Sequence, residues 1–238
     1  MKKSYSRAFT LIELTVVVTI IIVLFAVALP AFRGALERAK ATKDMNNLRQ
    51  IGMATQLYMN DNSGVLFSTT AGSWMSQLYS VTAATPKYLS SWNTFISPFD
   101  RPISPRTSSI NSANSAVSYG INGTAGVVGI STDRISKPTA FIVFAPAQAS
   151  GARVTFQSVG NTTTQAALAS SANVTVVAQT TNPGNQTVTG GTHNSRTKIN
   201  ALCADWHVEN MTWSGTGPAF THTTDPGSDP DAPFRWSP

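Results

Sequence analysis

A long apolar run near the amino terminus constrains the fold more than any other feature of this sequence. Residues 11–32 read LIELTVVVTIIIVLFAVALPAF and contain a single charged side chain. About 22 residues in a helix span about 33 Å, which matches the hydrocarbon core of a bilayer. Residues 1–8, MKKSYSRA, carry three positive charges, and such charges mark the cytoplasmic side of a membrane helix. The sequence therefore predicts one membrane-spanning helix over residues 9–32, with the amino terminus in the cytoplasm.

A secretory signal peptide is the competing interpretation of the same run. A basic start followed by an apolar stretch is typical of one, and Ala26, Val27 and Ala28 resemble a small-x-small cleavage site. Two features oppose this interpretation. Glu13 lies inside the apolar run, where an ionised carboxylate is costly, and the helical pattern continues beyond Pro30. A segment that is removed needs neither feature, so we favour a helix that the mature protein keeps.

Residues 33–62 continue the helix with a different pattern. Apolar residues recur there every three or four positions, which predicts a helix with one buried stripe. Pro30 removes one backbone hydrogen bond and predicts a bend, and the turn residues 60–64, NDNSG, predict the helix end. The charged and polar residues in between, including Asp44 and Asn47, are predicted to face solvent. The predicted stripe consists of Ala35, Leu36, Ala39, Met45, Leu48, Ile51, Thr55, Tyr58 and Met59.

Residues 63–238 change period and predict a β-rich domain. Short segments rich in branched and aromatic residues alternate with Ser/Thr/Asn/Gly-rich stretches, which predicts strands separated by loops. Residues 66–116 lack this pattern and predict short helices and loops. The fold class expected is α+β, with the long helix packed on an antiparallel sheet. The predicted strands cover residues 140–145, 152–157, 173–178, 198–203 and 206–211.

The composition favours an exported, non-enzymatic protein. Charged residues make up 12% of the chain, against about 25% in typical domains, and such a surface suits packing against copies of itself. The net charge of +6 includes three charges in residues 1–8, and the remaining basic residues are mixed with acidic ones, so nucleic-acid binding is not expected. No phosphate loop, nucleophile elbow or HExxH motif is present.

One group of side chains has the residue types of a zinc site, but its spacing matches no standard site. Cys203, Asp205 and His207 alternate along the chain, and a turn at residues 204–206 is expected to separate them. We therefore expect hairpin hydrogen bonds instead, and a buried, inert cysteine. With a single cysteine, the chain can form no intramolecular disulfide. The full set considered is His193, Cys203, Asp205, His207 and His222.

Residues 8–14, AFTLIEL, resemble the prepilin cleavage and methylation motif of type IV pilins and type II secretion pseudopilins. The resemblance implies a leader of residues 1–8, cleavage between Ala8 and Phe9 by a prepilin peptidase, and N-methylation of Phe9. It places Glu13 at the family's acidic position and Pro30 at its helix-bending proline. Ala8 departs from the glycine usual there, which implies slower processing.

Several segments of the second half also resemble large pilin-like proteins of planctomycetes and verrucomicrobia. These segments are residues 58–64, 95–100, 118–122, 193–194 and 204–209. In that family a glycine stands where this chain has Trp206, which puts the turn geometry in question because Trp resists a positive φ.

The resemblance makes a calcium loop relevant, since some type II pseudopilins carry one near the carboxyl terminus. Asp225, Asp229 and Asp231 cluster as oxygen ligands would, although the neighbouring prolines and the lack of a bidentate Glu favour a solvated, flexible tail. No other cofactor is expected.

Together these features predict a structural subunit of a helical filament assembled at the inner membrane, most consistent with type II protein secretion. The expected partners are the prepilin peptidase, other pilin or pseudopilin subunits and the inner-membrane assembly platform. The globular domain would lie in the periplasm or outside the cell. The alternative is a surface type IV pilin that binds a ligand in adhesion or DNA uptake, for which Trp213, Arg235 and Trp236 are the candidate contacts. In either case Glu13 is expected to pair with the Phe9 amine of a neighbouring subunit.

Overall fold

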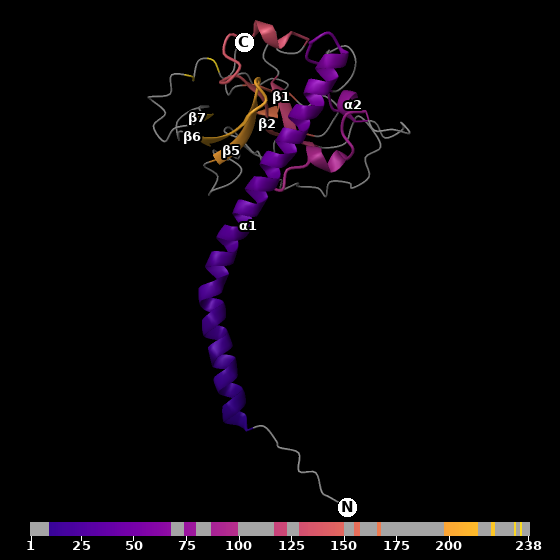
Figure 1. Ribbon diagram of the computed structural model, residues 1–238. Coiled ribbons are helices and arrows are strands. Elements are labelled where there is room, and N and C mark those ends of the chain that lie inside the picture. Colours follow the sequence, from indigo (N-terminus) through magenta and orange to yellow (C-terminus); the bar gives the residue numbers. More distant parts are fainter. Residues whose placement is uncertain are drawn as a thin grey trace, which may run out of the picture. The chain divides into compact units, whose positions relative to one another are not determined.

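The chain forms one long helix, α1, followed by short helices and a mixed β-sheet (Figure 1). This computed structural model describes residues 10–67, 74–79, 87–99, 117–122, 129–149, 155–157, 166–167, 198–213, 220–221, 231 and 234. Contacts along the chain define two units, Met1–Ala39 and Lys40–Pro238. The first holds the apolar half of α1, and the second holds the remainder of α1 together with the sheet.

Helix α1 spans Leu11–Asp61 and passes through Pro30 without interruption. The helix ends as its turn residues predict. The backbone N–H of Gly64 donates to the carbonyl of Met59 at 2.8 Å, and both Ser63 and Gly64 adopt a positive φ. These are the marks of a left-handed helix terminus, in which a small residue satisfies an otherwise unpaired carbonyl. The prediction of one continuous helix over residues 9–62 is confirmed within two residues at the described end points.

The central sheet is antiparallel, as predicted. Its strands are β1 (Val117–Asn122), β2 (Ile142–Ala149), β5 (Lys198–Cys203) and β6 (Val208–Trp213), which pair in that order. Among the described residues, β7 (Phe220–Thr221) extends one edge. At the other edge β3 (Thr155–Gln157) and β4 (Ala166–Ala167) add two parallel pairings that the sequence did not predict.

The sequence located some strands better than others. β5 coincides with the prediction, and β2, β3 and β6 overlap theirs. β1 was not predicted, since Gly120 and Asn122 weaken its strand pattern. The strand predicted over residues 173–178 lies outside the described residues. The short helices expected within residues 66–116 are confirmed as α2 (Trp74–Leu78) and the 3₁₀ turn η1 (Trp92–Phe95).

The core of the second unit lies between α1 and the sheet. Leu48 and Ile51 of α1 are fully buried, and they belong to the same apolar cluster as the central residues of β2 and β5. Aromatic rings complete the cluster: Trp74 packs at 4.9 Å from Phe144 and at 5.2 Å from Phe95 between ring centroids. Such edge and tilted ring contacts are the geometries that aromatic quadrupoles favour.

The face that α1 buries differs in part from the predicted stripe. Asp44 and Asn47, expected in solvent, are buried, whereas Ala35, Leu36 and Ala39 are exposed. The apolar stripe is correct only from Leu48 onward. The sequence pattern failed because the buried polar side chains have specific partners on other elements, described below.

Candidate functional site

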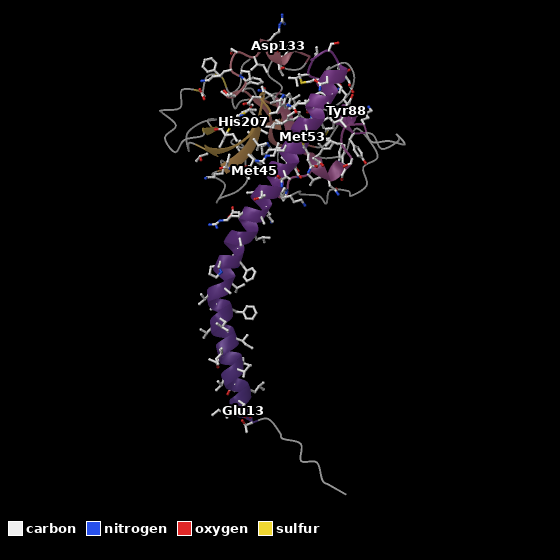
Figure 2. The ribbon with its side chains drawn as sticks, viewed as in Figure 1. Glu13, Met45, Met53, Tyr88, Asp133 and His207 are labelled. Atoms are coloured by element: carbon white, nitrogen blue, oxygen red, sulfur yellow. The ribbon has the colours of Figure 1, made fainter. Side chains whose placement is uncertain are left out.

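The first half of α1 carries a continuous apolar surface. The large apolar side chains of residues 11–32 are between 45% and 80% exposed, and Figure 2 shows them projecting from the helix on all sides. Within the described residues this is the one helix long and apolar enough to cross a membrane. An exposed apolar surface of this length requires a membrane or a protein partner to cover it.

Glu13 forms a capping box with Thr10 at the amino end of this helix. Its Oε2 accepts hydrogen bonds from the Thr10 backbone N–H at 2.9 Å and from the Thr10 hydroxyl at 2.7 Å. In return the Glu13 N–H donates to Thr10 Oγ1 at 3.3 Å. The arrangement satisfies helix-end donors, and the helix dipole favours a carboxylate there. The Thr-x-x-Glu spacing is a sequence signature of this motif, although the capping box was not predicted above. Ala8 and Phe9 lie outside the described residues.

The threonines of the apolar half satisfy their hydroxyls within the helix. Thr15 Oγ1 donates to the Ile12 carbonyl at 3.0 Å, and Thr19 Oγ1 donates to the Thr15 carbonyl at 2.7 Å. A hydroxyl bonded in this way adds little cost in an apolar environment. The Glu13 carboxylate is therefore the one charged group that this half of the helix presents to a membrane or a partner, within residues 11–32.

Asp44 is the centre of a buried polar network. Its Oδ1 accepts hydrogen bonds from the Ser97 hydroxyl and the Tyr119 hydroxyl, both at 2.5 Å, and its Oδ2 accepts one from Asn200 Nδ2 at 2.8 Å. Burial raises the pKa of Asp44, while these three hydrogen bonds act to lower it. The carboxyl is fully buried, and the three donors replace the water that it loses.

The network continues from the helix across the sheet. Asn210 Nδ2 of β6 donates to Asn200 Oδ1 of β5 at 2.8 Å, and Asn47 Nδ2 donates to the Ile96 carbonyl at 2.9 Å. A helix rotated by one residue would remove Asp44 from all of its donors. The network therefore fixes which face of α1 meets the sheet, a role in specificity that is well attested for buried polar groups.

The β5–β6 turn places Trp206 in a conformation that few non-glycine residues adopt. Its φ is +72°, at the position where glycine is usual in the pilin-like proteins that the sequence resembles. The Trp206 N–H donates to the Cys203 carbonyl at 3.0 Å, and the Cys203 N–H donates to the His207 carbonyl at 2.9 Å. The ring packs beside Leu202 at Gly52, where an added Cβ would lie 3.7 Å from the ring and 3.1 Å from Leu202. Packing on the helix offsets the cost of the left-handed backbone.

This turn brings together three side chains that could hold a metal ion. One ligand atom each from Cys203, His207 and Glu209 lie within 4.8 Å of one another. The expectation that the turn would separate Cys203 from His207 is wrong, because it places them opposite each other. Cys203 is buried as expected. His207 Nδ1 contacts Asp205 Oδ1. His193 and His222 lie outside the described residues.

The carboxyl-terminal calcium candidates fall largely outside the described residues. Asp225 and Asp229 lie there, as do the side chains of Trp213, Arg235 and Trp236. Asp231 is described, and its carboxylate pairs with Lys137 Nζ, which also lies 5.5 Å from the centre of the Phe234 ring. The calcium loop therefore stays a prediction.

Comparison of the chain with protein-family models, with curated proteins and with solved structures finds no match in any of the three.

Proposed function

We propose that this protein is a structural subunit of a helical filament, built at the inner membrane from copies that stack their amino-terminal helices. The observation that carries the proposal is the exposed apolar half of α1, which is capped by Glu13 and begins within the prepilin-like residues 8–14. In the membrane, lipid covers this surface. In the filament, the same surface of neighbouring copies covers it.

The folded second unit suits the exterior of such a filament. Among the described residues, its core is closed by the buried stripe of α1 and by aromatic contacts. Its surface is poor in charge, which favours close packing against copies of itself. We place this unit in the periplasm or outside the cell, and the most consistent role is that of a pseudopilin in type II protein secretion.

Glu13 has two roles in this proposal. Within one subunit it caps the helix through Thr10. After cleavage, Phe9 would carry a free ammonium group close to this carboxylate. In a filament core both charges are costly unless they are paired. Pairing between Glu13 of one subunit and the Phe9 amine of the next would fix the register of the stack.

Mass spectrometry of the protein purified from membranes tests the processing step. We expect a mature chain that begins at N-methylated Phe9. A chain that begins at Leu29, freed from the membrane, would contradict the proposal and restore the signal-peptide interpretation. An uncut chain would also contradict it.

Variants at the cleavage site provide the matched controls. In cells that express a prepilin peptidase, Ala8→Gly should be processed faster than the parent chain, and Ala8→Leu should remain uncut. Equal processing of all three chains would show that residue 8 is not recognised by the peptidase.

The runner-up is a surface pilin that binds a ligand in adhesion or DNA uptake. A surface pilin would have the same helix and the same processing, but its filament would extend from the cell surface and bind a ligand there. A gel-shift assay of the purified full chain with double-stranded DNA separates the two, since a secretion pseudopilin should give no salt-sensitive shift.

A further inference from the structure

The β5–β6 hairpin gathers three metal-binding side chains on one face of the sheet. Asn200 and Leu202 of β5 face α1, because Asn200 contacts Asp44 and Leu202 lies at Gly52. Side chains alternate along a strand, so Cys203 lies on the opposite face.

The same rule places the β6 side chains. Asn210 meets Asn200 on the helix side, so Glu209 lies on the other face together with His207, two residues before it. The Cys203 N–H bonds to the His207 carbonyl, which sets those two residues directly across the turn. Glu209 lies opposite Ala201 in the sheet register, and this small side chain leaves room beside the carboxylate.

The distances are close to those of a tetrahedral site. The three ligand atoms lie within 4.8 Å of one another, and His207 Nε2 lies 4.0 Å from Glu209 Oε2. Ligands bound to a tetrahedral zinc ion at about 2.0–2.3 Å lie roughly 3.3–3.8 Å apart. The observed separations are larger than this range, so a bound ion would draw the three side chains toward one another.

Asp205 orients the imidazole for such a role. Its Oδ1 contacts His207 Nδ1 and also accepts a hydrogen bond from the His207 backbone N–H at 3.2 Å. With the proton of neutral His207 held on Nδ1, the lone pair lies on Nε2, which faces Glu209. A carboxylate behind a ligating histidine is the usual arrangement in protein metal sites, and it fixes the orientation of the ring.

We propose that Cys203, His207 and Glu209 bind a divalent transition-metal ion, with Zn²⁺ the preferred occupant. A thiolate, an imidazole and a carboxylate form a donor set that suits Zn²⁺ and disfavours Ca²⁺ and Mg²⁺. The Cys203 side chain is buried, whereas the side chains of His207 and Glu209 are 43% and 21% exposed. The ion therefore enters from solvent and keeps one position for water or a further ligand.

The ion would tie the two strands together at their turn. A chain with one cysteine has no disulfide within itself, and an exported domain gains from a metal link because binding to the folded state alone favours that state. The positive φ of Trp206 raises the free energy of the folded turn. A metal link at this turn would therefore offset a local conformational cost. The site is independent of filament assembly.

Metal titration of the full chain in detergent, stripped of metal and kept reduced, tests the proposal. Calorimetry with Zn²⁺ should show one saturable site. Co²⁺ should give the intense near-ultraviolet absorption of a cobalt–thiolate bond together with the visible bands of tetrahedral cobalt. Cys203→Ser should abolish the thiolate absorption, and His207→Gln should weaken Zn²⁺ binding by roughly a hundredfold or more.

Two further variants separate ligation from general effects on the fold. Asp205→Asn should weaken Zn²⁺ binding by roughly 10–100-fold and leave the cobalt–thiolate absorption in place at saturation. Asp133→Asn removes an exposed carboxylate outside the hairpin and should change nothing. Circular dichroism should show that each variant is folded, and His207→Gln at an exposed turn position keeps the test valid if Cys203→Ser does not fold. Absence of a saturable site, or full-strength binding by folded His207→Gln, would overturn the proposal.

Discussion

The hydroxyl of Tyr119, in the middle of β1, donates a 2.5 Å hydrogen bond to Asp44 on α1, and both side chains are fully buried. Residues 75 positions apart in sequence thus meet through a carboxylate at the interface between helix and sheet. Burial raises the pKa of both groups, and the nearby Asp44 raises that of Tyr119 further. This contact should therefore affect the free energy of unfolding and its dependence on pH.

The stability of the second unit should depend on the ionisation of Asp44. Burial raises its pKa in the folded state above the ordinary value of 3.8, so the folded chain keeps a proton that the unfolded chain has lost. The contribution to stability is therefore complete below about pH 3.8 and is lost as pH rises through the folded pKa. Urea unfolding measured from pH 3.8 upward should show that the free energy of unfolding falls less steeply with pH in Asp44→Asn than in the parent chain. Asp133→Asn serves as the control, and an unchanged slope in Asp44→Asn would contradict the prediction.

Tyr119→Phe should cost more stability than Tyr58→Phe. The Tyr119 hydroxyl serves a buried carboxyl, and hydrogen bonds to charged groups contribute about 1.5–3 kcal/mol. The Tyr58 hydroxyl donates to Gln77 Oε1 at 2.6 Å, a bond between neutral groups that contributes about 0.5–1.5 kcal/mol. The loss at Tyr119 should also grow as Asp44 ionises, so chemical unfolding at two pH values checks both parts. Equal losses at both tyrosines would mean that Asp44 stays neutral throughout.

Substitutions at Glu13 can separate its helix cap from its charge. Glu13→Gln keeps the side-chain oxygen that accepts from Thr10, and Gln serves a capping box as Glu does, but it cannot pair with an ammonium group. We expect both Glu13→Gln and Glu13→Ala to insert into the membrane normally and to lower filament yield by roughly tenfold or more, because the neighbouring amine is left unpaired. Thr10→Ala, which removes a cap partner without a charge, should assemble nearly normally. Electron microscopy of sheared filaments measures the yield. Normal assembly by Glu13→Gln would reduce the role of Glu13 to capping.

Trp206→Gly should be more stable than Trp206→Ala, although glycine usually weakens a fold. Both variants lose the ring that packs at Gly52. Only glycine adopts the +72° φ without steric cost, and relief of that cost is worth about 1–2 kcal/mol. Thermal unfolding of the two purified chains gives the comparison. The opposite order would mean that the turn rearranges when the ring is removed.

Periodicity predicted the elements well where one physical requirement dominates. The apolar run could only be a long helix, and β5 is recognisable because its short, largely apolar run forms a strand that is buried on both faces. The buried face of α1 was mispredicted before Leu48 because Asp44 and Asn47 are polar. The burial of Asp44 depends on Tyr119, Ser97 and Asn200, and Asn47 donates to the Ile96 carbonyl. Local periodicity in a sequence does not predict contacts between side chains that are so far apart along the chain.

The side chains of the hairpin were missed for a related reason. The residue types were recognised, but their proximity depends on a turn that Trp206 closes with a positive φ. The average backbone preferences of tryptophan disfavour a positive φ. The capping box at Thr10 and Glu13 is different, since it depends only on the local Thr-x-x-Glu spacing and can be predicted from the sequence alone.

The contact between Trp206 and the helix also bears on the order of folding events. An isolated β5–β6 hairpin would have to hold a tryptophan in a left-handed conformation with nothing to offset it. The hairpin should therefore not nucleate folding by itself but close as the helix docks, and hydrogen exchange at the Trp206 N–H should be as slow as in the helix core. A strand turn that needs the helix to complete it makes the second unit fold and unfold as a whole.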